Sequence, residues 1–151
     1  MSIATPKNIE QEGFDSSQFG SPPDWAVPGG YLQNILDAIA IRVRMEVGSD
    51  VYDAAAIDGT AIQQYHYVQI ASAEAAYASA ELWPRLEKFE RSTIKRNSAA
   101  DGVETIGSRL LKNAEAATLR GDLLLSTITG NVPDGAFAVG GVVSNHFEAV
   151  T

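Results

Sequence analysis

The sequence predicts a mainly α-helical protein: a small bundle of three principal helices, with a possible short fourth, between two non-helical ends. Three observations predict it. Apolar residues recur at spacings of three and four across residues 31–130. Residues 1–30 contain too many prolines and glycines for a helix of useful length, and residues 131–151 change to a pattern typical of extended chain. We therefore expect an extended N-terminal arm, a helical bundle domain and an extended, hairpin-like C-terminal tail with these bounds.

The N-terminal arm carries three separated aromatic residues, Phe14, Phe19 and Trp25. Segments without a fixed structure are usually poor in aromatic residues, so a purely solvated arm does not explain them. We expect these side chains to act as anchors, in pockets either on the same domain or on a neighbouring molecule. All three are therefore candidate partner-binding residues.

The first helix is predicted from about Tyr31 to Val47, with Gly48 as its C-terminal stop. Its expected buried face consists of Leu32, Ile35, Leu36, Ile39, Val43 and Val47. A short helical turn with Ser49 as its cap is expected to follow, up to about Ala56.

The second and longest helix is predicted to begin at Thr60, which forms a capping box with Gln63. Two apolar stripes indicate burial on more than one side. One is Val68, Ala71, Ala75, Ala78, Leu82, Leu86 and Phe89, and the other is Ile70, Ala73, Tyr77 and Ala80. Pro84 predicts a kink or a restart near Trp83, and the helix is expected to fade around residues 94–96.

The third helix is predicted to begin with a capping box of Asp101 and Glu104, and Gly130 ends it. Its seam is Val103, Ile106, Leu110, Ala114, Ala117, Gly121, Leu124 and Ile128. The small residues in this seam suit close contact with the alanine-rich second helix.

The C-terminal tail contains an apolar, glycine-interrupted run at residues 136–143 that resembles a strand, and a second short extended piece is expected at residues 146–151. Because an isolated two-stranded hairpin is marginal in water, the tail is expected either to pack on its own bundle or to pair with another chain. Phe137, Val139 and Phe147 are its candidate partner-binding residues.

Charge disfavours a protein that binds duplex DNA through its general surface, because the net charge is −8 and is spread along the chain. One local basic cluster is the exception, and its candidate partner-binding residues are Arg85, Lys88, Arg91 and Lys95. The competing interpretation is a solvated helix face with the pairs Glu81–Arg85 and Glu87–Arg91. No apolar run is long enough to span a bilayer, and no secretion signal is apparent, so we expect a protein made and used in the cytoplasm or packaged from there.

Catalytic signatures are missing from the sequence. There is no cysteine, and the two histidines, His66 and His146, lie in different predicted elements. No metal-binding spacing or phosphate-binding loop is present, so we expect no metal, no cofactor and no enzymatic activity. An active site formed between subunits, around His66 and Tyr65, is the remaining enzymatic alternative.

The order of these elements resembles the head-tail adaptor, or connector, proteins of tailed bacteriophages. The resemblance lies in a short first helix ending at Gly48, an acidic turn at residues 50–59, and two long helices. The long helices contain QIASAEAAYASAELW (69–83) and SRLLKNAEAATLRGDLLL (108–125). The resemblance implies a non-enzymatic virion subunit in a homo-oligomeric ring, twelvefold in this family. One side of such a ring binds the portal protein and the other a further neck or tail protein, while DNA passes through the lumen without sequence-specific binding.

A second function class fits the same pattern. A small helical binding or regulatory module, self-associating as a dimer through its alanine-rich faces, would show the same helices and the same lack of catalytic residues. The mass of the native particle distinguishes the two, because a ring contains many copies.

Overall fold

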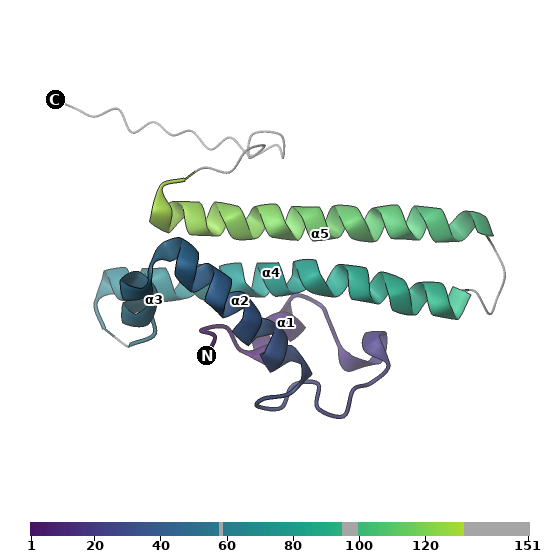
Figure 1. Ribbon diagram of the computed structural model, residues 1–151, viewed down its shortest axis with the longest axis horizontal. Helices are drawn as coiled ribbons and strands as arrows, with labels where there is room; N and C mark the ends of the chain where they lie inside the picture. Colours follow the sequence, from purple (N-terminus) through teal and green to yellow (C-terminus); the bar gives the residue numbers. More distant parts are fainter. Residues whose placement is uncertain (58, 95–99, 132–151) are drawn as a thin grey trace.

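The computed structural model describes residues 1–57, 59–94 and 100–131, and at helical positions 87–94, 100–106 and 108 only the backbone is described. All regular structure in these residues is helical (Figure 1). In chain order the elements are α1 (Pro6–Gln11), the 3₁₀ helix η1 (Ser16–Phe19), α2 (Tyr31–Val47), α3 (Ser49–Ala55), α4 (Ala61–Ile94) and α5 (Ala100–Thr129). The predicted fold class, a small and mainly helical bundle, is confirmed.

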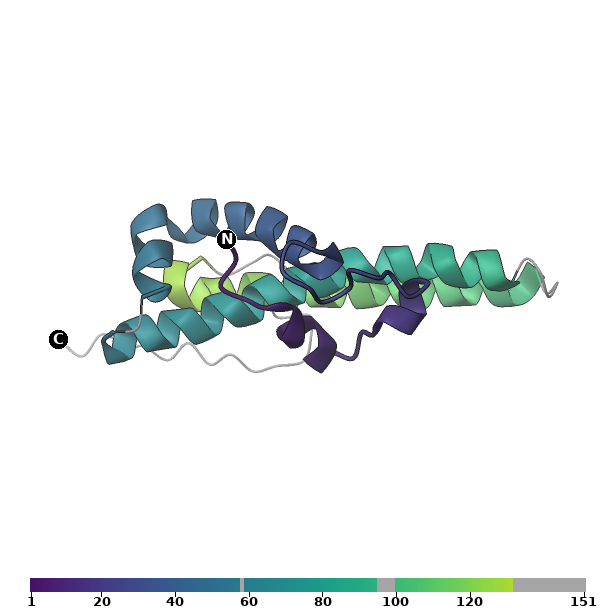
Figure 2. The ribbon, with the colours of Figure 1, turned by 90° about the horizontal axis from the view of Figure 1, so that it is seen from below.

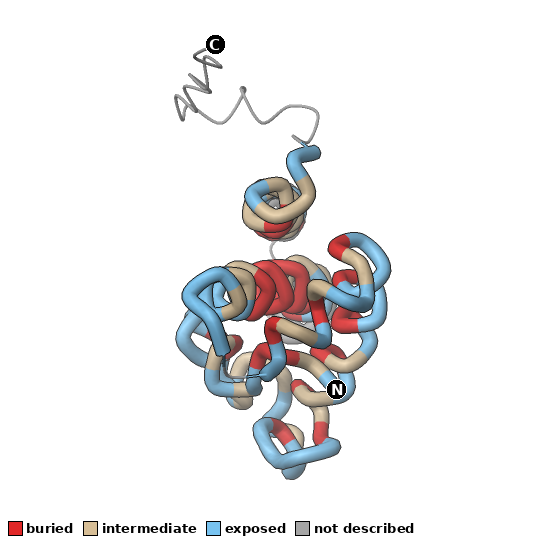
Figure 3. The backbone as a smooth tube through the Cα atoms, turned by 90° about the vertical axis from the view of Figure 1, so that its left-hand side faces the viewer, coloured by how far each residue is buried: buried red, intermediate tan, exposed pale blue. Residues whose placement is uncertain are grey.

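Helix α4 is the centre of the molecule. Figure 1 shows α5 antiparallel to it on one side and the N-terminal segment on the other, while α2 and α3 cross in front of it. Helix α2 contacts α5 as well as α4. Viewed along the helices, the buried residues gather on α4 (Figure 3). Its middle turns, residues 70–79, are buried except at Ser72, which explains the two apolar stripes of the sequence.

Helix α2 has the predicted bounds, and all six residues of its predicted apolar face are buried. Gly48 follows it with φ of +91°, a conformation that L side chains rarely adopt, so a glycine is required there. The short helix α3 is also confirmed. Its predicted cap is wrong, because the N-cap is Gly48 and Ser49 is the first helical residue, without a capping hydrogen bond.

The start of α4 is held by the predicted capping box. The Thr60 amide donates to Gln63 Oε1 at 2.8 Å, and the Gln63 amide donates to Thr60 Oγ1 at 3.4 Å. The helix continues through Pro84 as one element, so the predicted restart does not occur. Val68, placed on the buried stripe by its spacing, is exposed.

The pairing of α4 with α5 depends on a close approach at Gly121. A methyl group at this position would stand 2.7 Å from Tyr77 Cε1, so the Tyr77 ring fills the space that a side chain would need. The Tyr77 hydroxyl donates to Asp122 Oδ1 at 2.6 Å. The small-residue seam is therefore confirmed at Ala117 and Gly121. Further along α5 the prediction differs from the structure, because Leu125 is fully buried whereas Leu124, which was placed in the seam, is only partly buried.

The N-terminal segment differs most from the prediction of an extended arm. Thr5 and Asn8 form a capping box that begins α1, with Pro6 in the first turn, where its missing amide hydrogen costs nothing. Asp15 and Gln18 form a second box around η1. Ile3, Ala4, Ile9, Phe14 and Trp25 are buried in the same core as α2 and α4. Residues 1–30 are thus part of the folded body.

The predicted C-terminal strands, residues 136–143 and 146–151, lie outside the described residues. The described chain ends just beyond Gly130, which follows α5 with φ of +76°. This agrees with the predicted stop of the third helix.

Candidate functional site

A row of aromatic rings joins the N-terminal segment to α4. Phe14 packs edge-on against Trp83 at 4.9 Å between ring centroids, and Phe19 lies 6.1 Å from Phe14. Trp25 stacks on Phe19 at 5.2 Å and on Tyr31 at 5.4 Å. Rings at these separations attract one another beyond their burial alone. The row therefore fastens the segment to the bundle.

The predicted partner-binding role of Phe14, Phe19 and Trp25 is corrected by this arrangement. Phe14 is 3% exposed and Trp25 is 7% exposed, so neither presents a surface to another molecule. Phe19 is partly buried against the same core. The sequence left open whether these side chains would enter pockets on the same domain or on a neighbouring molecule. In the structure they pack on their own domain.

The basic cluster is described in part. Arg85 forms an ion pair with Glu81 at 3.3 Å, and its guanidinium also donates to the Tyr31 hydroxyl at 3.3 Å. This is the helix-face pairing that the sequence offered as the alternative to partner binding. The side chains of Lys88 and Arg91 are not among those described, and Lys95, Phe137, Val139 and Phe147 lie outside the described residues.

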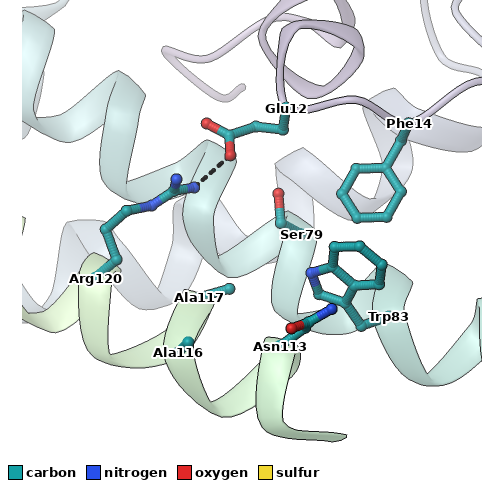
Figure 4. Close-up of a pocket in the computed structure, with 8 residues that line it drawn as sticks. All are labelled: Glu12, Phe14, Ser79, Trp83, Asn113, Ala116, Ala117 and Arg120. Carbon is teal, nitrogen blue, oxygen red and sulfur yellow. Dashed lines mark hydrogen bonds and ion pairs between the residues drawn. The ribbon is translucent and has the colours of Figure 1, made fainter. Parts of the chain in front are cut away.

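A shallow cavity of about 270 Å³ lies where the N-terminal segment meets α4 and α5. Figure 4 shows Phe14 and Trp83 at one end and the ion pair of Glu12 with Arg120 at the other. The Ser79 hydroxyl, which also lines it, donates to the Ala75 carbonyl at 2.9 Å. Three of its polar side chains, Glu12, Arg120 and Ser79, thus already have partners within the protein. No histidine lines this cavity, so a serine nucleophile would have no imidazole base beside it.

A buried carboxylate, Glu74, joins α4 to the beginning of the chain. Its side chain is fully buried. One oxygen, Oε2, accepts a hydrogen bond from the Ala4 amide at 2.6 Å, and the other, Oε1, accepts one from the Tyr52 hydroxyl. Burial raises the pKa of Glu74 above its ordinary value, and the two hydrogen bonds oppose that shift. Burial and the neighbouring Glu74 raise the pKa of Tyr52 as well, so Tyr52 is a neutral donor.

Glu74 is the polar residue that the sequence interpretation missed. A buried carboxyl with a raised pKa is a common feature of active sites. Here both oxygens accept hydrogen bonds from the protein's own donors, the Ala4 amide and the Tyr52 hydroxyl. We therefore assign it a structural role in holding the N-terminal segment. The signal was present in the sequence, since position 74 lies between the two apolar stripes of α4.

Two surfaces expose large apolar side chains. On the outer face of α2, Ile41 is 66% exposed and Met45 is 82% exposed. A second group lies between α3 and α4 and on the first two turns of α4. Its members are Ile57, Ile62, Tyr65, Tyr67 and Val68. Scattered apolar residues are normal on a surface, but contiguous groups mark interaction sites.

His66 lies among this second group, half-buried, with its ring 6.0 Å from that of Tyr65. Within the described ranges, no three His, Asp or Glu side chains are grouped so that they could hold a metal ion. None of the described helices combines the length and apolar character needed to cross a bilayer. No carboxylate is hydrogen-bonded to His66 in the part of the chain that the structure describes.

Comparison with known proteins returns no match: no family model, no curated protein and no solved structure is similar to this chain.

Proposed function

We propose that the protein is a non-enzymatic structural subunit that assembles into a homo-oligomeric ring, as in the head-tail adaptors of tailed bacteriophages. The observation that carries this proposal is the projection of the α4–α5 hairpin. Figures 1 and 2 both show the distal turns of this hairpin extending past α2 and the N-terminal segment. In those turns the two helices run beside each other and beside no other described element.

In a projecting arm of two helices, each helix buries only the side that faces the other, and its remaining sides stay available to another subunit. A subunit between two neighbours in a ring needs one surface for each of them, and these surfaces differ because the contact is head-to-tail. The hairpin arm supplies one candidate surface. The apolar pair on α2, Ile41 and Met45, supplies a second on another part of the body.

Charge supports the remaining part of the proposal. With a net charge of −8, a ring of this subunit would repel DNA along its lumen, which suits DNA that must slide without binding. The portal protein on one side and a further neck or tail protein on the other are the partners proposed, with the virion neck as the location and twelve copies as the expected number.

The decisive measurement is the mass of the native particle, by light scattering and by electron microscopy of the purified protein. We expect a ring of many copies, alone or with the portal protein. Met45→Glu should dissociate it while leaving the far-UV helical signal unchanged. Gln11→Glu adds the same charge to an exposed position on α1 and should have no effect.

Two results would count against the ring. A protein that stays monomeric at every concentration, with and without the portal protein, would overturn the proposal. A stable dimer that Met45→Glu dissociates would instead favour the second function class, a self-associating helical binding module.

A further inference from the structure

The first two turns of α4 contain no buried residue. Across residues 61–68, six side chains are exposed and two are half-buried. A helix of two turns gains little stability by itself and depends on the packing of one of its faces. These turns belong to residues 59–73, which contain no Asp, Glu, Lys or Arg, although a solvated helix face normally carries charge. The exposed apolar residues there therefore mark an interaction surface.

Ile62 and Tyr65 form a ridge on one side of these turns. They lie about 60° apart around the helix axis, because successive residues turn by about 100°. On the same wheel Gln64, Tyr67 and Val68 lie on the opposite side, where they line a groove beside α3. Ile62 is 64% exposed and Tyr65 is 46% exposed. We call these two residues the α4 ridge.

A pocket of about 320 Å³ lies where α2 ends and α3 begins. Its lining consists of Ile41, Arg44, Met45, Gly48 and Ser49, and we call it the α2 pocket. Ile41 and Met45 lie one helical turn apart and form its exposed apolar wall. Methionine, arginine and tyrosine are residue types that are enriched where proteins meet, so the α2 pocket and the α4 ridge both have the composition of an interface.

We infer that the α4 ridge of one copy docks in the α2 pocket of the next copy. The inference rests on the proposed ring, because a head-to-tail contact joins two different surfaces of the same chain. Ile62 and Met45 are both exposed, so the ridge and the pocket do not cover each other within one copy. A helix ridge that enters a hollow on another helix is also the usual geometry of helix packing.

Charge favours a second copy as the occupant. Two copies that each carry a net charge of −8 repel one another wherever their acidic surfaces meet. Neither residue of the ridge is charged, and at the pocket Arg44 is paired with Asp53, so this contact brings no unpaired charges of like sign together. The Arg44 side chain is still 50% exposed, and its guanidinium can lie over the Tyr65 ring of the neighbour in a cation–π contact. A basic protein would find no carboxylate on the ridge to attract it.

Two single variants separate the two halves of this contact. Met45→Glu places a charge in the α2 pocket and leaves the ridge intact, and Ile62→Glu does the reverse. We expect neither variant to assemble alone, whereas an equimolar mixture forms a 1:1 dimer through the one ridge and the one pocket that remain. Native mass spectrometry, with one variant labelled with ¹⁵N, gives the composition of the dimer, and far-UV circular dichroism checks that both variants are folded. Gln64→Glu places the same charge on the opposite side of α4 and should assemble like the natural protein.

Disulfide trapping detects the same contact when one contact alone is too weak to persist. The chain contains no cysteine, so each introduced thiol is unique. Met45→Cys mixed with Ile62→Cys should form the mixed disulfide at least about tenfold faster than Met45→Cys mixed with Gln64→Cys, because docking raises the effective concentration of the two thiols. Equal rates would overturn the inference. Disulfides formed mainly between two Ile62→Cys chains would also overturn it, because the ridge would then meet the ridge of another copy.

The ring itself is judged separately, from the mass of the natural protein. A ring without a mixed dimer and without the faster crosslink would refute the ridge-to-pocket contact and leave the ring standing. Assembly of either glutamate variant alone would refute the contact as well. A mixed dimer together with open filaments of the natural protein would support the contact and refute the ring. A natural protein that stays monomeric and forms no crosslink would overturn both.

Discussion

The closeness of Gly121 to Tyr77 predicts a specific cost of adding one methyl group. In an exposed helix, Gly→Ala stabilises by about 1 kcal/mol, because alanine restricts the unfolded chain and favours helix. At Gly121 the new Cβ would stand 2.7 Å from Tyr77 Cε1 and 2.8 Å from Cζ, closer than real Cβ contacts allow. Something must therefore move.

The Tyr77 ring is poorly able to move. Its hydroxyl donates to Asp122, the residue next to Gly121, at 2.6 Å, and the Arg42 guanidinium lies 4.2 Å from the ring centroid. Arg42 also lies 3.7 Å from Asp122. Burial, followed by the Asp122 carboxylate, raises the pKa of Tyr77, so its hydroxyl remains protonated and keeps its hydrogen bond at neutral pH. Displacing the ring disturbs all three groups.

We expect Gly121→Ala to lower the free energy of unfolding by about 1 kcal/mol, the result of roughly 2 kcal/mol of overpacking against about 1 kcal/mol of helix propensity. With a urea m-value near 2 kcal/mol/M, the midpoint moves down by about 0.5 M. Urea unfolding followed by far-UV circular dichroism measures this. Gly121→Leu, which adds three more carbons at the same point, should cost more.

The control is the same substitution in a Tyr77→Leu background, where the crowding ring atoms are gone. There Gly121→Ala should raise the midpoint, and the two backgrounds should differ by about 2 kcal/mol. If Gly121→Ala stabilises both backgrounds equally, the ring is free to move and the close approach does not determine the packing of α4 and α5.

Three further predictions concern the N-terminal segment. Phe14→Ala should lower the free energy of unfolding by about 3 kcal/mol through lost burial against Trp83, measured in urea; unchanged stability would mean that Phe14 is an anchor for a partner after all. Deleting residues 1–25 should lower the urea midpoint and expose the aromatic surface of α4, and a midpoint equal to that of the intact protein would contradict the observed core. Because the folded pKa of Glu74 is raised, its ionisation opposes folding, and stability is lost as pH rises from the ordinary carboxyl pKa through the raised one. Glu74→Gln should therefore gain stability relative to the natural protein as pH rises above the ordinary carboxyl pKa, as measured by urea midpoints over a pH series, and parallel pH curves would refute the assignment.

Helix boundaries were the most predictable part of this protein. The bounds of α2 follow from apolar spacing and Gly48, and the start of α4 follows from Thr60 and Gln63, because capping and periodicity act over a few neighbouring residues. Ser49 shows the limit of this local reasoning. It is a good capping residue by type, but the glycine before it takes the cap position.

The burial of individual residues was less predictable. Val68 continues an apolar stripe, yet it is 57% exposed, because apolar spacing along one helix does not show where its neighbours stop covering it. Phe14 and Trp25 lie among prolines and glycines, yet they are buried because Trp83 and Tyr31 receive them. Trp83, which buries Phe14, lies far from it in the sequence, so no local pattern could indicate this contact.

The candidate surfaces show the same division. Apolar spacing alone could not reveal Ile41 and Met45 as an exposed pair, because exposure is defined by what the rest of the chain leaves uncovered. Glu74 was readable in principle as a carboxylate between two apolar stripes. One of its two hydrogen-bond donors, the Ala4 amide, is 70 residues away in the sequence, so no local pattern could predict this contact.

The sequence alone determined that the chain would form helices, both ends of α2, the start of α4 and the end of α5, and which small residues would let α4 and α5 approach. Those properties depend on side chains within one or two turns of one another. The tertiary structure alone decided that the first 30 residues join the core, that Glu74 is buried, and that the first turns of α4 stay uncovered by α5. Those outcomes depend on which distant segments reach the same place, and on where a covering helix stops.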